Sequence, residues 1–198
     1  MAPRNRTEMV EQTKYMLIKT ARKAFATKGF AAASMDNLTA DAGLTRGALY
    51  HNFGDKKGLL RAVIDQIDTE IVARLITAHD QAPTPWQGLM DENIAFIEMA
   101  LEPEIQRIML LDGPAVLGDP SQWPNQTGCL RRTAQSIRQL IADGVVKPVN
   151  PEVTARLING AALSAALWVA TEDASHTVLE NAIESFRALM TGLLCHSP

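Results

Sequence analysis

Apolar residues recur at intervals of three and four positions along most of the 198-residue chain. This spacing matches the 3.6-residue period of an amphipathic helix. The first such stripe, in a helix expected over residues 7–28, consists of Val10, Leu17, Ile18, Ala21, Ala24 and Phe25. No useful length of chain alternates apolar and polar residues as a half-buried strand does. The pattern therefore predicts an all-α protein.

Glycine, proline and capping residues divide the remaining pattern into further helices. A long helix is expected from Asp55, which can cap it, to the Ala-Pro-Thr-Pro segment at 82–85. Later helices are expected over 86–101, from Pro103, over 130–143, from Pro151 and from Ser175. Residues 113–128 contain three Gly and three Pro, which predicts a loop.

Residues 34–61 are expected to form two short helices joined by a tight turn. A third helix follows them directly. Ser34 and Thr45 can cap the first two, because each hydroxyl can accept a hydrogen bond from a free N–H of the first turn. Gly43 supplies the left-handed backbone conformation at which a helix ends. This arrangement predicts a helix-turn-helix with an exposed recognition helix, which makes DNA binding the first hypothesis.

The distribution of charge changes the meaning of the total charge. The whole chain carries a formal net charge of −3, which by itself argues against a nucleic-acid partner. Residues 1–61 hold eleven Lys or Arg and five Asp or Glu, a net charge of +6, and residues 62–198 carry −9. A basic N-terminal part on an acidic body indicates that only the former faces phosphate. A merely solvated basic surface is the alternative.

The segments KTARKAFATKGFAAASMDNLTADA and GLTRGALYHNFGDKKGLLRAV resemble the DNA-binding domain of TetR-family bacterial transcriptional regulators, over roughly residues 12–64. The resemblance rests on A-x-x-x-F-x-x-x-G-F, A-G-L-T, G-A-L-Y-x-x-F and the following D-K. Two positions differ, since Leu38-Thr39 stands where the family usually has Ile-Ala, and Asn52 where His is common. We expect a three-helix helix-turn-helix domain over residues 1–54 and a C-terminal helical ligand-binding and dimerisation domain over residues 55–198.

The recognition helix must present hydrogen-bond donors to base edges and phosphates. Arg46 stands in its first turn with no evident intramolecular partner, and Lys56 begins the next helix, whose N-terminus favours a phosphate. The candidate DNA-binding residues, which match positions that the family uses, are Ser34, Thr45, Arg46, Gly47, Tyr50, His51 and Lys56. The alternatives are that Thr45 is only a cap and that Tyr50 is partly packed.

The C-terminal part is rich in methionine and aromatic residues. The resemblance implies a small-molecule pocket there, and the candidate ligand-binding residues are Trp86, Met90, Phe96, Met109, Trp123 and Trp168. A place in the core is the alternative for each of them. Large adaptable side chains and an acidic balance favour a small apolar or amphipathic inducer, with Arg107, Asp112 and Gln126 open as polar contacts.

The last two expected helices, residues 151–172 and 175–195, have the character of an oligomer interface. The segment NGAALSAALWVA is apolar nearly all round, which a simple surface helix is not. Two such helices from each subunit would form a four-helix bundle in a homodimer. A buried monomer core is the alternative.

Other classes of function find no support in the sequence. The four His show no metal-ligand spacing, and there is no phosphate-binding loop or nucleophile elbow. We therefore expect no catalytic residues, no metal and no cofactor. Cys129 is either a redox switch or, more simply, a packed thiol. With no apolar run of about 18 residues and no signal peptide, we expect no membrane partner and a cytoplasmic protein.

These observations predict a ligand-responsive transcriptional regulator. The expected protein is a repressor that binds a near-palindromic operator in double-stranded DNA as a homodimer and is released by a small-molecule inducer. One alternative is a transcriptional activator of the same fold. The other is a helical small-molecule-binding protein or enzyme that keeps the DNA-binding part for another purpose.

Overall fold

The computed structural model describes residues 6–124, 126–172 and 175–195. No strand occurs within these ranges, where an isolated bridge pairs Val146 with Leu194, so the prediction of an all-α fold is confirmed. The elements, in chain order, are α1 (Arg6–Ala32), α2 (Met35–Asp41), α3 (Arg46–Phe53), α4 (Lys56–Gln81), α5 (Pro85–Glu98), the 3₁₀ turn η1 (Met99–Leu101), the π-helix η2 (Ile105–Asp112), α6 (Gly113–Leu117), the 3₁₀ turn η3 (Pro120–Gln122), α7 (Gln126–Ala142), α8 (Pro151–Thr171) and α9 (Ser175–Thr191).

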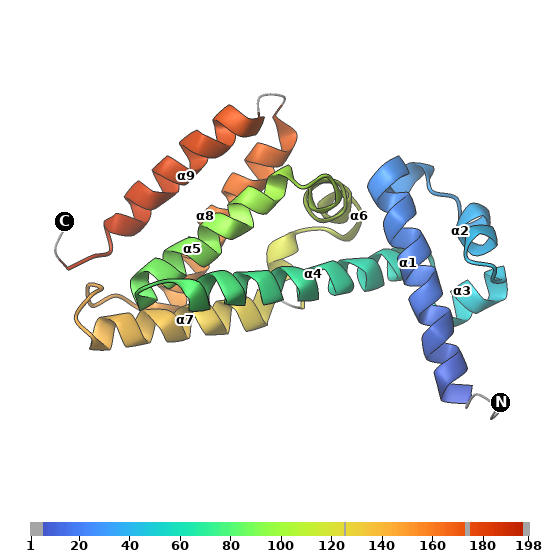
Figure 1. Ribbon diagram of the computed structural model, residues 1–198, viewed down its shortest axis with the longest axis horizontal. Coiled ribbons are helices and arrows are strands. Elements are labelled where there is room, and N and C mark those ends of the chain that lie inside the picture. Colours follow the sequence, from blue (N-terminus) through green and yellow to red (C-terminus); the bar gives the residue numbers. More distant parts are fainter. Residues whose placement is uncertain (1–5, 125, 173–174, 196–198) are drawn as a thin grey trace.

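Helices α1 to α3 form a small head at one end of the molecule, and α5 to α9 form the body (Figure 1). One hydrophobic core extends through head and body, and its part within the head, the head core, contains Leu17, Phe25, Leu38 and Leu49 from α1, α2 and α3. The start of α4 completes it with Leu59 and Leu60, which are fully buried.

Local capping sets the ends of the short helices in the head. Ser34 Oγ accepts a hydrogen bond from Asn37 N at 3.1 Å, and Thr45 Oγ1 accepts one from Ala48 N at 3.2 Å. Asp55 Oδ1 accepts one from Gly58 N at 2.7 Å at the start of α4. These three predicted caps are confirmed, and each satisfies a first-turn N–H that has no partner within its helix.

The two departures from the family pattern are accommodated within their own helices. Thr39 is buried, and its hydroxyl donates to the carbonyl oxygens of Met35 and Asp36, both at 3.1 Å. Asn52 donates from Nδ2 to Ala48 O at 2.7 Å. Neither side chain therefore leaves a buried donor without a partner.

Helix α4 is a single element of 26 residues that connects the head to the body (Figure 1). Its buried row continues from the head core into the body core through Val63, Ile64, Ile67, Ile71 and Leu75. In the body, α8 packs against α5, α7 and α9.

Helix α8 differs from the expectation that no segment suits a membrane. By length and composition alone it would suffice to cross one, with a mean hydropathy of 1.4 over an 18-residue window. Core helices of soluble proteins pass the same test. The contacts of α8 with three other helices of the body account for only part of its apolar composition, because 39% of that window is buried.

The loop predicted for residues 113–128 is wrong for most of that segment. The π-helix η2 continues directly into α6, where Pro114 lies in the first turn and its missing N–H costs nothing. A β-carbon at Gly113 would lie 2.8 Å from the Trp123 ring, so the indole packs directly on this backbone. Helix α7 then begins at Gln126, four residues earlier than expected.

Polar contacts fix the head to the body beside α4. The Arg22 guanidinium of α1 donates to Glu70 of α4, at 2.6 and 2.7 Å, and to Glu104, at 2.7 Å. The chain breaks its helical conformation at Gly29, with φ of 78°, and the next residue, Phe30, donates its N–H to Asp112 Oδ2 at 2.7 Å. The head is thus held by α4 and by the η2 segment.

Gly58 allows the end of α3 to approach α4 closely. A β-carbon at this position would overlap the carbonyl oxygen of Phe53, the last residue of α3. We predict that Gly58→Ala lowers the free energy of unfolding by about 1–3 kcal/mol, because backbone atoms must shift. Urea denaturation followed by far-UV circular dichroism, at one fixed protein concentration, measures this change.

Gly128→Ala is the matched control for this substitution. No heavy atom lies within 4 Å of a β-carbon at Gly128, which is exposed in α7. Its helical conformation should make the change neutral or stabilising by up to about 1 kcal/mol. Equal loss of stability in both variants would contradict the close approach at Gly58.

Candidate functional site

Helix α3 presents an open face at the end of the head. Leu49 is fully buried and anchors the helix, while Thr45, Arg46, Gly47, Tyr50 and His51 are exposed. The Tyr50 ring is 53% exposed, so packing does not hide its hydroxyl. A β-carbon at Gly47 would meet only Thr45 Oγ1, at 3.7 Å. The structure therefore brings these five candidate DNA-binding residues onto one solvent-facing helix.

Arg46 has an intramolecular partner, contrary to the sequence expectation. Its guanidinium Nε pairs with the Asp36 carboxylate of α2, and this hydrogen bond raises the pKa of Arg46. Both side chains are largely exposed, so solvent screens the pair and it adds little stability. Asp36 orients Arg46 across the surface between α2 and α3, where a phosphate or base edge can replace the carboxylate.

Lys56 is held by the head itself. Its Nζ donates to Ala31 O at 3.4 Å and lies 4.3 Å from the centroid of the Phe30 ring. Burial lowers the pKa of Lys56, and the charge of Asp112 opposes that shift. The assignment of Lys56 to a phosphate stays a prediction, and Lys57 beside it is exposed.

Ser34 lies apart from α3, at the start of α2, where it is exposed and serves as the cap. Thr45 also caps its own helix while remaining exposed. A capping hydroxyl uses one acceptor site and keeps its O–H free to donate. Both residues can therefore cap a helix and contact a phosphate at the same time.

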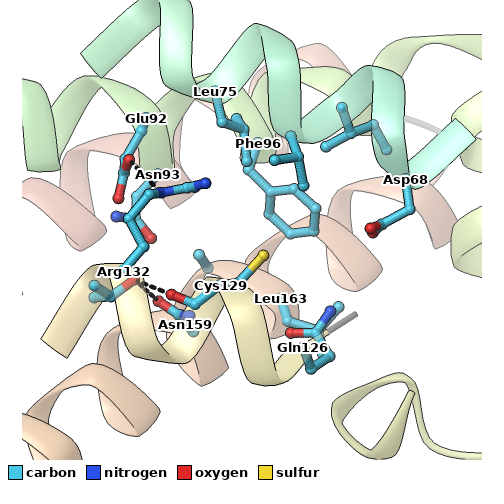
Figure 2. Close-up of a pocket in the computed structure, with 14 residues that line it drawn as sticks. Asp68, Leu75, Glu92, Asn93, Phe96, Gln126, Cys129, Arg132, Asn159 and Leu163 are labelled. Atoms are coloured by element: carbon cyan, nitrogen blue, oxygen red, sulfur yellow. Dashed lines mark hydrogen bonds and ion pairs between the residues drawn. The ribbon is translucent and has the colours of Figure 1, made fainter. Parts of the chain in front are cut away.

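The body holds an inner cavity of about 60 Å³ between α4, α5, α7 and α8. One part of its wall is apolar, and Figure 2 shows the Phe96 ring at its centre. The other part carries Glu92, Asn93, Arg132 and Asn159. A wider hollow of about 520 Å³ shares Asp68, Val72, Cys129 and Arg132 with it. A third hollow of about 160 Å³ shares Asp68 and Gln126, so the three hollows adjoin one another.

A buried carboxylate dominates the electrostatics of the inner cavity. The Glu92 side chain is only 5% exposed, and its Oε2 lies 3.3 Å from His79 Nδ1 and 3.7 Å from Arg132 Nε. Burial raises the pKa of Glu92, while the charges of Arg132 and His79 oppose that shift. No hydrogen bond of good geometry reaches Glu92 Oε2 or Arg132 Nε among the described residues.

The predicted ligand-binding residues are dispersed through the body. Phe96 lines the inner cavity and Trp123 the third hollow. Met90 and Met109 are buried core residues, and none of the three hollows includes them or Trp86. Trp168 is 49% exposed, with its indole N–H donating to Glu172 at 3.1 Å. The geometry therefore supports only Phe96 and Trp123 as pocket residues.

Sequence reasoning missed Glu92 and Arg132. A usable signal existed in α5, where Glu92 and Asn93 interrupt the apolar run from Leu89 to Ile97. Two adjacent polar residues that helical periodicity places on a buried face indicate a polar site inside the body.

Helix α8 also carries an apolar face that the described residues do not cover. Leu157 is 69% exposed, and it shares this face with Val153, Gly160, Ser164 and Trp168, at intervals of three and four residues. Leu189 of α9 is 70% exposed. A regular exposed row on α8, extended by Leu189 on the neighbouring α9, is typical of a protein–protein contact.

Comparison with known proteins agrees with this geometry. A family model described as bacterial regulatory proteins of the TetR family matches residues 17–63. A second, described as the C-terminal domain of tetracyclin repressor-like proteins, matches residues 86–193, more than half of the chain. The chain belongs to the TetR family. It is therefore a TetR-family transcriptional regulator, and the family resemblance drawn from the sequence is confirmed.

Individual relatives extend over nearly the whole chain. A TetR-family regulator from Pectobacterium atrosepticum is 46% identical, with a TM-score of 0.91 over 98% of this chain and 100% of that one. The regulator UidR of Escherichia coli K12 is 22% identical over 94% of this chain and 95% of its own. SmeT, the repressor of a multidrug efflux pump in Stenotrophomonas maltophilia, shares the fold at 21% identity, with a TM-score of 0.68 over 92% of each chain.

Cys129 provides a chemical probe of the cavity, because its thiol lines the inner cavity and burial raises its pKa. The thiolate is the reactive form. We predict that Cys129, as the single thiol of a Cys195→Ser variant, reacts with iodoacetamide at pH 7.5 about tenfold or more slowly than free cysteine. The Cys129→Ser variant is the control, because it gives the reaction rate of Cys195 alone. If Cys129 reacts as fast as free cysteine, its thiol does not lie in the cavity wall.

Proposed function

We propose that this TetR-family regulator is a repressor that binds a near-palindromic operator as a homodimer and is released by a small apolar or amphipathic molecule. Residues 1–54 act as the DNA-binding domain and residues 55–198 as the ligand-binding and dimerisation domain. A cytoplasmic location follows from this role. The exposed recognition helix α3, fixed by caps and by buried Leu49 on a basic head, is the observation that carries the proposal.

The uncovered stripe on α8 and α9 supports the homodimer. TetR-family regulators function as dimers, and each subunit presents an exposed row on α8 together with Leu189 of α9. A two-fold contact uses the same patch on both subunits. The two heads then meet two half-sites related by the same two-fold axis, which explains why we propose a near-palindromic operator.

Helix α4 supports a response to a ligand. Asp68, Ile71 and Leu75 line the inner cavity, and Leu59 and Leu60 of the same helix are buried in the head. A ligand that binds differently to two positions of α4 shifts the position of the head. Weakening operator binding tenfold requires about 1.4 kcal/mol of such differential affinity.

The first prediction concerns the recognition helix. Arg46→Ala should weaken binding to a specific operator by roughly 10-fold to 100-fold, because a charged donor at the duplex is removed. Arg131→Ala, which removes an exposed arginine from α7 in the body, is the control and should leave affinity unchanged. Fluorescence anisotropy with a labelled operator duplex measures both. Equal affinities for the two variants would remove Arg46 from the interface.

The second prediction concerns the dimer. Leu157→Glu should produce monomers at micromolar concentration, because an unpaired carboxylate in a dry interface costs several kcal/mol. The position is exposed within one chain, so the fold should persist. Analytical ultracentrifugation measures the mass, with Gln135→Glu on exposed α7 as the control. A wild-type protein that sediments as a monomer, or a dimeric Leu157→Glu variant, would show that this face is not the interface.

A further inference from the structure

The polar end of the inner cavity restricts the chemistry of the ligand. We propose that this cavity recognises a neutral molecule in which an apolar body carries a hydroxyl group, as in a phenol or an alcohol. The inference rests on the proposed response to a small molecule and specifies the class of molecule.

The first observation is a pair of buried polar atoms that lie too far apart to form a hydrogen bond with each other. Glu92 Oε2 and Arg132 Nε are 3.7 Å from each other, beyond the usual 2.7–3.2 Å of an N–H···O bond. No hydrogen bond of good geometry reaches either atom among the described residues, and both are buried. His79 Nδ1 lies 3.3 Å from Glu92 Oε2 on the same side and is a second cationic or donor group there. Glu92 Oε2 is an acceptor and Arg132 Nε a donor. An atom that both donates and accepts can lie within bonding distance of the two at once.

Charge then decides which group fits between them. A ligand carboxylate would accept from Arg132 but would face the Glu92 carboxylate, and Asp68 adds a second carboxyl group to the cavity wall. A ligand ammonium would donate to Glu92 but would face the Arg132 guanidinium. A hydroxyl donates one hydrogen bond and accepts another without net charge. A hydroxyl can therefore donate to Glu92 and accept from Arg132 without placing a second charge beside either residue.

The surrounding wall defines the rest of the ligand. Ile71, Leu75, Phe96 and Leu163 line the same inner cavity and suit an apolar or aromatic body. The inner volume of about 60 Å³ accepts only the polar end of such a molecule. The adjoining hollow of about 520 Å³, which shares Asp68, Val72, Cys129 and Arg132 with the inner cavity, has room for the remainder. Figure 2 shows Glu92 and Arg132 on one side of the Phe96 ring and Asp68 on the other.

A matched series of compounds tests the proposal directly. The probes are 4-propylphenol, 4-propylbenzoate and 4-propylbenzylamine, which share one body and differ in the charge of the polar group at pH 7.5. Isothermal titration calorimetry on the wild-type protein should show the phenol binding at least tenfold more tightly than either charged compound. A wild type that ranks a charged compound first, or that binds none of the three, overturns the proposal.

Two charge-removing variants should invert this preference. Glu92→Gln leaves Arg132 without its counter-charge and should favour the benzoate, and Arg132→Gln should favour the benzylamine. The controls are Glu98→Gln on α5 and Arg131→Gln on α7, which make the same charge changes at exposed positions. Both controls should keep the wild-type order. Variants that change the affinity for all three compounds by one common factor overturn the proposal.

Operator binding, measured on the same preparations, separates this inference from the function it rests on. A dimer that binds a specific operator but fails the ranking contradicts the hydroxyl-bearing ligand and leaves the DNA-binding role intact. A wild type that binds no duplex specifically contradicts the proposed function instead. If Glu92→Gln does not fold, the wild-type ranking and Arg132→Gln, whose side chain is partly exposed, still decide the outcome.

Discussion

The structure depends on the continuity of α4, because this one helix contributes to the hydrophobic core in both the head and the body. Leu59 and Leu60 close the core of the head, and Ile71 and Leu75 form part of the cavity wall in the body. A helix transmits displacement along its axis unless a proline, a bulge or an inserted side chain bends it. In the function we propose, movement of α4 at the cavity displaces the base of the head and so couples the two candidate sites.

Polar contacts outside α4 limit how the head can respond. Arg22 bridges Glu70 and Glu104, and Asp112 accepts the Phe30 N–H just after the break at Gly29. The head is therefore attached at two places, α4 and η2. The Glu70 and Glu104 carboxylates are 50% and 35% exposed, so solvent screens these ion pairs and each contributes little to stability.

The sequence predicted features that are set locally and missed those set by tertiary contact. Caps at Ser34, Thr45 and Asp55 follow from a hydroxyl or carboxylate next to an apolar period, and all three are present. The helical turns within residues 113–128 depend instead on Trp123 packing against Gly113. Likewise, the large side chain of Trp168 predicted a pocket residue. The polar end of the cavity is formed instead by Glu92 and Arg132, and only the packing of α5 against α7 brings these two residues together.

The central claim is that two identical heads read one operator, and selection of bound duplexes from random-sequence DNA tests it most directly. The selected sequences should converge on two inverted half-sites with a fixed spacing, because a two-fold dimer presents two α3 helices in opposite orientations. One selection experiment therefore determines both the half-site and the geometry of the dimer. Convergence on a single half-site without an inverted copy, or no enrichment of any sequence, would contradict the account.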